Sequence, residues 1–262
     1  MESIGIITAL SRESHTIFPH LQAIEIQRKE SFTLIKGRFM QRPVYVVQSG
    51  IGRKNAVMAL ETLIEEARPG VLLSCGWAGA LNPDFAIGEI VIVEKVMGPP
   101  HHCFPGKKYG ERGETSKQLR QSLGKFLTDH GIGFSMASII TVDTPLATAR
   151  EKANFFSTYR VGAVDMETSA LVECANRKGL PLAGLRVISD HVSMEFDLGL
   201  LKHFNDKGKL GFLAHAARKP KAFMQLLYFR YGTHIACKHL TNVIYPVLCA
   251  LGENLRRPVM PG

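Results

Sequence analysis

The sequence predicts an α/β fold in which helices cover both faces of a central, largely parallel or mixed sheet. Short apolar runs alternate with stretches of helical apolar spacing through the first 200 residues, and glycine-rich breaks separate several of these runs from the helix that follows. The chain has 262 residues, of which 45% are hydrophobic. It can therefore bury a substantial core as one domain, or as one domain plus an appendage.

The predicted elements follow one another as strand, turn and helix. Residues 3–10 form the first strand, and Ser11 or Ser14 is expected to cap the helix after it. The break at residues 49–52 joins a strand at residues 44–47 to a helix that contains residues 56–64. The remaining strands are predicted at residues 71–75 (stopped by the glycines of residues 76–80), 89–96, 137–142 and 183–188, with helices at residues 149–156 and 170–175 and a polar loop at residues 98–115.

The basic charge of the chain lies in its last quarter. Residues 1–200 carry a net charge of +1, whereas residues 201–262 carry +8. From Leu200 the sequence becomes helical, with Pro220 and Pro246 as helix starts or breaks. We therefore divide the chain into a domain at residues 1–200 and a basic amphipathic helical extension at residues 201–262. The nearly neutral body disfavours nucleic acid as a partner.

The cysteines and the N-terminus predict a cytoplasmic protein. The five cysteines are scattered without a regular framework, which is typical of free thiols in a reducing compartment. The chain begins directly with a strand pattern, and no apolar run reaches the roughly 18–20 residues that span a bilayer. His101-His102-Cys103 has no third ligand at standard spacing, so we predict no metal site.

Three carboxylates each follow a separate apolar strand at its carboxyl end, namely those of Glu13, Glu167 and Asp190. The carboxyl ends of strands in an open α/β sheet are where ligands bind, so these side chains are expected along one edge. Glu167 lies at a junction between a strand and a helix, two residues after Asp165. Three acids without a metal-ligating cluster fit proton transfer and hydroxyl binding. The alternative for each is an acid that complements a helix N-terminus.

Five blocks of the sequence resemble the superfamily of purine nucleoside phosphorylases and methylthioadenosine/S-adenosylhomocysteine nucleosidases. They occur in the order found there, over roughly residues 3–200, as residues 4–13, 49–52, 76–79, 164–167 and 186–190. The segments at residues 142–148 and 217–220 are most similar to the hopanoid-associated phosphorylase group, which is thought to remove adenine from adenosylhopane. The resemblance implies a three-layer α/β/α fold with a mixed, partly barrel-like sheet, and a homo-oligomer that uses no cofactor.

The resemblance also implies catalytic roles. Cleavage of an N-glycosidic bond develops positive charge on the ribose and negative charge on the base, so an acid and hydroxyl acceptors both help. By motif match, Asp190 is the acid near purine N7, and Glu167 accepts hydrogen bonds from the ribose hydroxyls beside Met166. Glu13 is the general base toward water. Each of these residues also has an alternative, purely structural role: Asp190 caps a helix, Glu13 is an acid in the first turn of a helix, and Met166 is a core residue.

Further residues complete the implied site. Arg186 and Ser189 orient the attacking group and Asp190, although Arg186 can instead pair with a structural carboxylate. Leu146 and Ala147 match the backbone segment that binds the base, and Phe156 is an apolar neighbour or a core residue. The remaining predicted substrate-binding residues are Gly50, Gly76 and Trp77.

Water is preferred over phosphate as the attacking group. Phosphorolysis needs a cationic cradle for a dianion, and the body offers Arg53 and Arg186 but no dense arginine cluster. A carboxylate at Glu13 deprotonates water but repels phosphate. If the enzyme is instead a phosphorylase, phosphate is its co-substrate.

Trp77, the only tryptophan, departs from the pattern of the nucleosidases. They usually carry a small residue there, commonly serine. Trp77 either stacks against a ligand and reshapes the sugar site or fills an interface. This departure puts the ordinary methylthioadenosine substrate in doubt.

The basic extension suggests contact with an anionic membrane surface. Residues 219–238 mix basic side chains with aromatic and aliphatic ones, which suits a helix that rests on a membrane and presents the enzyme to a lipid-linked nucleoside. The alternative is a helix that packs on its own body or on a partner subunit. The three competing functions are cleavage of an adenosine with a large apolar 5′ group, an ordinary nucleosidase or phosphorylase, and a catalytically silent nucleoside-binding or membrane-peripheral protein.

Overall fold

The computed structural model describes residues 2–100, 109–196 and 220–256. Its strands are β1 (Ser3–Thr8), β2 (Gln22–Arg28), β3 (Thr33–Phe39), β4 (Arg42–Gln48), β5 (Pro69–Ala80), β6 (Ile90–Gly98), β7 (Gly110–Glu114), β8 (Ser135–Thr141), β9 (Ala163–Asp165) and β10 (Leu182–Asp190). Its helices are α1 (Ser11–His15), the 3₁₀-helix η1 (Phe18–His20), α2 (Arg53–Ala67), α3 (Lys117–Asp129), α4 (Ala149–Tyr159), α5 (Thr168–Arg177) and α8 (Pro220–Asn254).

The strands form one mixed sheet that is partly closed. Its order is β10-β6-β8-β9-β5-β1-β4-β3-β2, and β7 pairs with β6. A further pairing joins β10 to β5, so five of the strands close into a ring. Strands β1, β4, β5 and β10 run parallel to one another, which brings their carboxyl ends to one edge. The predicted mixed, partly barrel-like sheet is confirmed.

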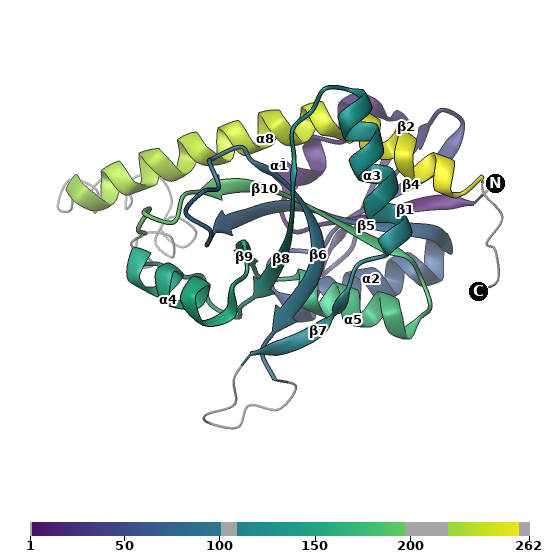
Figure 1. The fold of residues 1–262 in the computed structure, drawn as a ribbon. Coiled ribbons are helices and arrows are strands. Elements are labelled where there is room, and N and C mark those ends of the chain that lie inside the picture. The colour runs from purple at the N-terminus through teal and green to yellow at the C-terminus, as the bar shows by residue number, and fades with distance from the viewer. Residues whose placement is uncertain (1, 101–108, 197–219, 257–262) are drawn as a thin grey trace.

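Helices cover both faces of this sheet, as predicted (Figure 1). On one face, α3 and α8 pack over a buried cluster that includes Ile4 and Leu185. On the other face, α2 and α5 pack over a second cluster that includes Ile7 and Leu72. Successive side chains of β1 and β5 point alternately into the two clusters, so both faces of these strands are buried. This burial explains why their sequences are continuous apolar runs.

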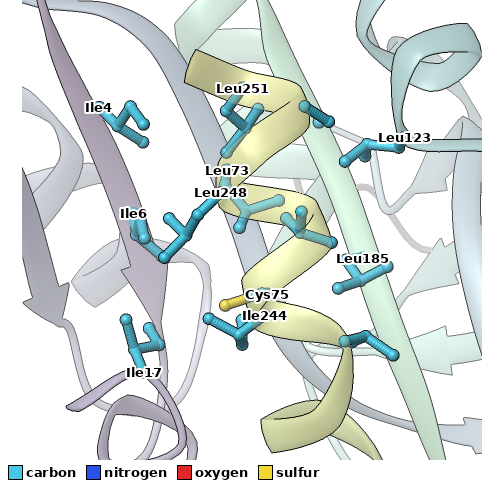
Figure 2. Close-up of a cluster of buried hydrophobic side chains, with 14 of the residues drawn as sticks. Ile4, Ile6, Ile17, Leu73, Cys75, Leu123, Leu185, Ile244, Leu248 and Leu251 are labelled. Atoms are coloured by element: carbon cyan, nitrogen blue, oxygen red, sulfur yellow. The ribbon is translucent and has the colours of Figure 1, made fainter. Parts of the chain in front are cut away.

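The C-terminal half of α8 is a core helix. Ile244, Leu248 and Leu251 point from α8 toward the strands and are fully buried (Figure 2). Residues Leu227–Asn254 are long and apolar enough to cross a membrane by length and composition, although no run of this length was predicted from the sequence. Half of an 18-residue apolar window within this segment is buried inside the structure. The apolar character of the buried C-terminal half of α8 therefore reflects packing against the sheet. The predicted domain boundary at residues 200–201 lies outside the described residues.

Several predicted boundaries were wrong. The strand at residues 71–75 does not stop at the glycines but continues to Ala80, because Gly76 and Gly79 lie in extended backbone paired with β10. Residues 110–114 of the predicted loop form β7, and its histidine pair lies outside the described residues. The N-cap of α1 is Leu10, not a serine. Pro246 lies inside α8, whereas Pro220 begins it.

Candidate active site

Glu13 is held by backbone N–H groups at the carboxyl end of β1. Its Oε2 accepts hydrogen bonds from the N–H groups of Ala9 and Leu10 at 2.9 and 2.8 Å, and its Oε1 accepts one from Trp77 at 2.9 Å. The side chain is buried, and burial raises its pKa against the lowering effect of these hydrogen bonds and of Arg186. A carboxylate with a raised pKa and one remaining acceptor position is suited to take a proton from water.

Gly76 leaves the space that Glu13 occupies. A Cβ atom at this position would lie 2.6 Å from the Oε1 atom of Glu13. In the structure Gly76 lets the carboxylate of Glu13 lie directly against β5, because it has no side chain at this point.

Glu167 occupies the N-cap position of α5 but does not cap that helix. Its Oε1 accepts a hydrogen bond of 2.8 Å from the N–H of Gly52, the second glycine of the break after β4. Gly52 has a φ of +98°, a backbone conformation that favours glycine. The carboxylate that caps α5 is that of Asp165, which accepts from the N–H of Thr168 at 3.2 Å.

Arg186 forms a fully buried ion pair with Asp165. Its Nε and Nη2 lie 3.1 and 3.0 Å from Oδ2 of Asp165. Nη1 donates to the carbonyl oxygens of Ser74 and Leu185, and Nη2 also reaches the hydroxyl groups of Ser74 and Thr168. All five guanidinium N–H groups therefore have protein partners. Of the two roles predicted for Arg186, pairing with a structural carboxylate describes what the structure shows.

Asp190 ends β10, on the other side of the glycine segment from Glu13. Its Oδ1 accepts a hydrogen bond of 2.7 Å from the hydroxyl of Ser189. A Cβ at Gly79 would lie 2.8 Å from its Oδ2, so Gly79 makes room for Asp190 as Gly76 does for Glu13. At a rise of about 3.3 Å per residue, these two glycines stand roughly 10 Å apart along β5. The two acids thus face different parts of any ligand at this strand end.

A narrow cavity of about 10 Å³ lies between Glu13, Glu167 and Arg186. That volume is sufficient for roughly one water molecule. Cys75 also lines it, but burial raises the pKa of this thiol to about 12, so it remains protonated and is a poor nucleophile. A larger groove of about 560 Å³ near the C-terminal end of α8 contains none of the predicted site residues.

This cavity is not lined by the predicted residues Leu146, Ala147, Met166, Phe156 and Gly50. Leu146, Met166 and Phe156 pack around one apolar cluster next to β9. The carbonyl of Ala147 accepts a hydrogen bond of 2.8 Å from the N–H of Phe196. Gly50 has a φ of +80° and donates its N–H to the carbonyl of Ala9, which ties the ends of β4 and β1 together.

The side chain of Trp77 lies on the opposite face of β5 from that of Ser74, which binds Arg186. Its ring packs against the cluster beneath α8, on the same face as Cys75 and Leu73. The buried indole N–H has no hydrogen-bond partner among the described residues. The backbone N–H, rather than the ring, contacts Glu13.

Three further residues contact the predicted site residues and were not predicted from the sequence, namely Lys152, Ser74 and Gly52. Lys152 is fully buried, and its Nζ lies 2.6 Å from Oδ2 of Asp190. A lysine in the first turn of a predicted helix gives no sign that its side chain points inward. Gly52 belongs to the same glycine break at residues 49–52 as the predicted residue Gly50, and this shared break could have indicated its role. Within the three described ranges, no group of three or more His, Cys, Asp and Glu side chains gathers to hold a metal ion.

The pH dependence of stability should reveal Glu167. Burial, followed by the charge of Asp165, raises the pKa of Glu167 from 4.5 to about 7. Because the folded state holds this proton more tightly, the stability it contributes is fully present below pH 4.5 and is lost as the pH rises through 7. Glu167→Gln is expected to raise the free energy of unfolding at pH 8 by on the order of 2 kcal/mol and to change it little at pH 4.5.

Thermal melting of the variant and the wild type at both pH values measures this effect. Glu151→Gln is the matched control, because hydrogen bonds from Thr148 lower the pKa of Glu151. That variant should lower the Tm at pH 8, and the opposite signs at the same pH separate the two sites. A Tm for Glu167→Gln that falls at pH 8 would contradict the raised pKa.

The strand-end acids lie on a mixed, partly closed sheet, and the sequence comparison shows the family to which this fold belongs. The profile of the Phosphorylase superfamily matches residues 3–223, so the chain belongs to this superfamily. The resemblance noted in the sequence is confirmed at that level. Enzymatic cleavage of an N-glycosidic bond, which the resemblance implied, is supported by this membership and by the relatives.

The chain is similar in sequence to nucleosidases and in fold to solved nucleosidase structures. The 5′-methylthioadenosine/S-adenosylhomocysteine nucleosidase of Staphylococcus saprophyticus is 26% identical over 201 residues, which are 71% of this chain and 86% of the relative. That of Chromohalobacter salexigens is 25% identical over 254 residues, 89% of this chain and 99% of the relative. The S-adenosylhomocysteine nucleosidase of Streptococcus pyogenes in complex with 5-methylthiotubericidin has a TM-score of 0.73 and 21% identity, with 98% of both chains covered. The Colwellia psychrerythraea nucleosidase in complex with adenine has a TM-score of 0.73 and 19% identity, with 95% and 96% covered. These structural likenesses confirm the fold.

Proposed function

We propose that the protein hydrolyses the N-glycosidic bond of a 5′-substituted adenosine and releases adenine. The observation that carries this proposal is the water-sized cavity lined by Glu13 and Glu167, with Asp190 at the end of β10 next to Gly79 of β5. The relatives named above are adenosine-type nucleosidases, and one related structure holds adenine.

The reaction assigns one step to each carboxyl group. The bond between C1′ and N9 breaks with its electron pair on the purine, and the proton of the Asp190 carboxyl group passes to N7. The oxygen of water bonds to C1′, and its proton passes to Glu13. Glu167 accepts hydrogen bonds from the ribose hydroxyl groups, which strengthen as positive charge develops on the sugar. The products are adenine and the free sugar.

Water is favoured over phosphate by the state of the cationic groups. Every N–H group of Arg186 is used by protein acceptors, so none remains for a phosphate dianion. Arg53 is paired with Asp143 at 2.9 Å. Glu13 and Glu167 line the same cavity as Arg186, and their charges repel a dianion.

The 5′ group is proposed to be large and apolar, as in adenosylhopane, which would place the reaction in hopanoid biosynthesis. The segment at residues 142–148 distinguishes this chain from the ordinary nucleosidase pattern and motivates this choice, whereas the ring of Trp77 packs beneath α8 and adds no support. We also propose a homo-oligomer, in line with the usual symmetric assembly of soluble enzymes.

A panel of 5′-substituted adenosines tests the substrate. Adenine release is measured by chromatography for adenosine, 5′-methylthioadenosine, S-adenosylhomocysteine and adenosines with 5′-alkyl chains of increasing length. The proposal expects kcat/KM to rise with the apolar chain. A preference for 5′-methylthioadenosine would reject the large substituent while keeping the nucleosidase, and absence of adenine from all substrates would reject both.

The N-terminal part of α8 is proposed to contact an anionic membrane surface at the inner face of the membrane. Met224, Leu227, Tyr228 and Tyr231 recur at helical spacing, and their exposed fractions are 49%, 44%, 60% and 62%. Arg230 of the same segment is also exposed. An apolar stripe with basic neighbours can insert into the headgroup region of anionic lipids.

Sedimentation with vesicles of phosphatidylglycerol and phosphatidylcholine tests the membrane contact. Because α8 fills the core, substitutions are preferable to a truncation. Tyr228→Ser/Tyr231→Ser is expected to reduce the bound fraction several-fold. The control Ile24→Ser/Ile26→Ser changes residues of β2 that are 40% and 52% exposed and should leave binding unchanged. Equal binding of both variants and the wild type would discard the contact.

A further inference from the structure

The strongest unassigned feature of the structure is Lys152, a fully buried lysine in contact with Asp190. Its Nζ lies 2.6 Å from Oδ2 of Asp190 and 3.0 Å from the carbonyl oxygen of His191. The same Nζ stands 5.0 Å from the centroid of the Phe196 ring. The three N–H groups of an ammonium are thus matched by an oxygen of the Asp190 carboxyl group, a carbonyl oxygen and an aromatic face.

The position of Lys152 links the acid to the segment predicted to bind the base. Lys152 lies on α4, whose N-cap residue Thr148 directly follows Leu146 and Ala147. Phe196, which covers the ammonium, donates its N–H to the carbonyl of Ala147 at 2.8 Å. One side chain therefore contacts both the end of β10 and the residues that fold back onto that segment.

A purely structural role does not explain why a lysine, and not an apolar residue, is buried at this position. Lys152 is the one buried residue of α4, so it does hold the helix to the body. Removing an ammonium ion from water costs several kcal/mol, and an apolar side chain would anchor the helix without that cost. The hydrogen bond from Ser189 already holds Oδ1 of Asp190. The ammonium adds a charge on the other oxygen of the same carboxyl group.

We propose that Lys152 is a positioning residue for the proton donor Asp190, an inference that rests on the proposed function. Lys152 holds Oδ2 in place and stabilises the carboxylate that remains once Asp190 has given its proton to N7 of the departing base. Ser189 acts on Oδ1 in the same way. The other charged and titratable side chains of the site form their hydrogen bonds with groups other than Lys152 and Asp190. They are Glu13, Glu167, Asp165 and Arg186.

Leaving groups that differ in their need for a proton test this role. The probes are 5′-methylthioadenosine, whose adenine leaves with a proton from the acid, and 4-nitrophenyl 5-methylthio-β-D-riboside, whose nitrophenolate leaves without one. Lys152→Met is expected to lower kcat for adenine release by about 10- to 100-fold, with KM nearly unchanged. It should lower nitrophenolate release by less than about threefold, and Lys152→Arg should restore part of the adenine rate.

Each outcome decides one question. Equal losses with both probes, or no loss with either, would overturn the role of Lys152. If Lys152→Met does not fold, Lys152→Met/Asp190→Asn removes both charges. The double variant should release adenine no more slowly than Asp190→Asn, because Lys152 acts through Asp190. A double variant at least tenfold slower would overturn the proposal. Failure of the wild type with 5′-methylthioadenosine and the whole substrate panel would instead reject the proposed function.

Discussion

Glu13→Gln is expected to lower kcat for adenine release by about 10²- to 10⁴-fold, the range by which a positioned general base accelerates a reaction. The amide cannot accept the proton of water, although its oxygen can keep the hydrogen bonds from Ala9 and Leu10. Substrate affinity should change little, since Glu13 faces the attacking group. Steady-state kinetics, with circular dichroism to confirm the fold, provide the measurement.

Gly76→Ala offers an independent route to the same loss. Its Cβ would lie 2.6 Å from the Oε1 atom of Glu13 and would displace a carboxylate that remains chemically intact. Gly133→Ala is the matched control, because a Cβ there meets nothing within 4 Å. Near-normal activity of Gly76→Ala would show that catalysis does not depend on Glu13 at the position seen here.

Arg186→Met is expected to destabilise the protein by about 3–5 kcal/mol, the usual cost of leaving one partner of a buried ion pair alone. Asp165 would keep its hydrogen bonds from Thr141 and Thr168 but would lose the balancing charge. Denaturant unfolding should show this as a lower midpoint with an unchanged slope. Asp165→Asn in the same chain should recover part of the loss.

The matched control for this prediction is Arg53→Met. Arg53 pairs with Asp143 at the surface, where the two side chains are 30% and 58% exposed. Exposed ion pairs contribute about 0–1 kcal/mol, so this variant should unfold almost as the wild type does. Equal losses for Arg53→Met and Arg186→Met would refute the structural role of the Arg186 pair.

The fold could be predicted because buried strands and glycine breaks leave a local pattern. The strands at β1, β4 and β10 read directly as apolar runs, and their alternation with helices indicated the layers. Strands β2 and β7 lack that pattern, since most of their side chains are exposed or half-buried. The burial of α8 also required knowledge of which surface it covers, because an apolar helix suits a core and a membrane equally well.

The site could be predicted in part, because its acids follow strand ends whose positions the sequence indicates. Glu13, Glu167 and Asp190 could be singled out in this way. Their partners could not, because the contacts of Gly52 with Glu167 and of Lys152 with Asp190 join distant parts of the chain. The role of Asp165 as partner of Arg186 depends on β9 meeting β5, a pairing that three residues of strand do not reveal.

Adenine release in phosphate-free buffer tests the central claim most directly. The wild type, Glu13→Gln and Asp190→Asn are compared with the adenosine substrate that the panel identifies, with and without added phosphate, and the sugar product is analysed by mass spectrometry. Hydrolysis predicts free sugar, equal rates in both buffers and a collapse of the rate in both variants. Strict dependence on phosphate, with sugar 1-phosphate as the product, would contradict the assignment of Glu13 as the base that activates water.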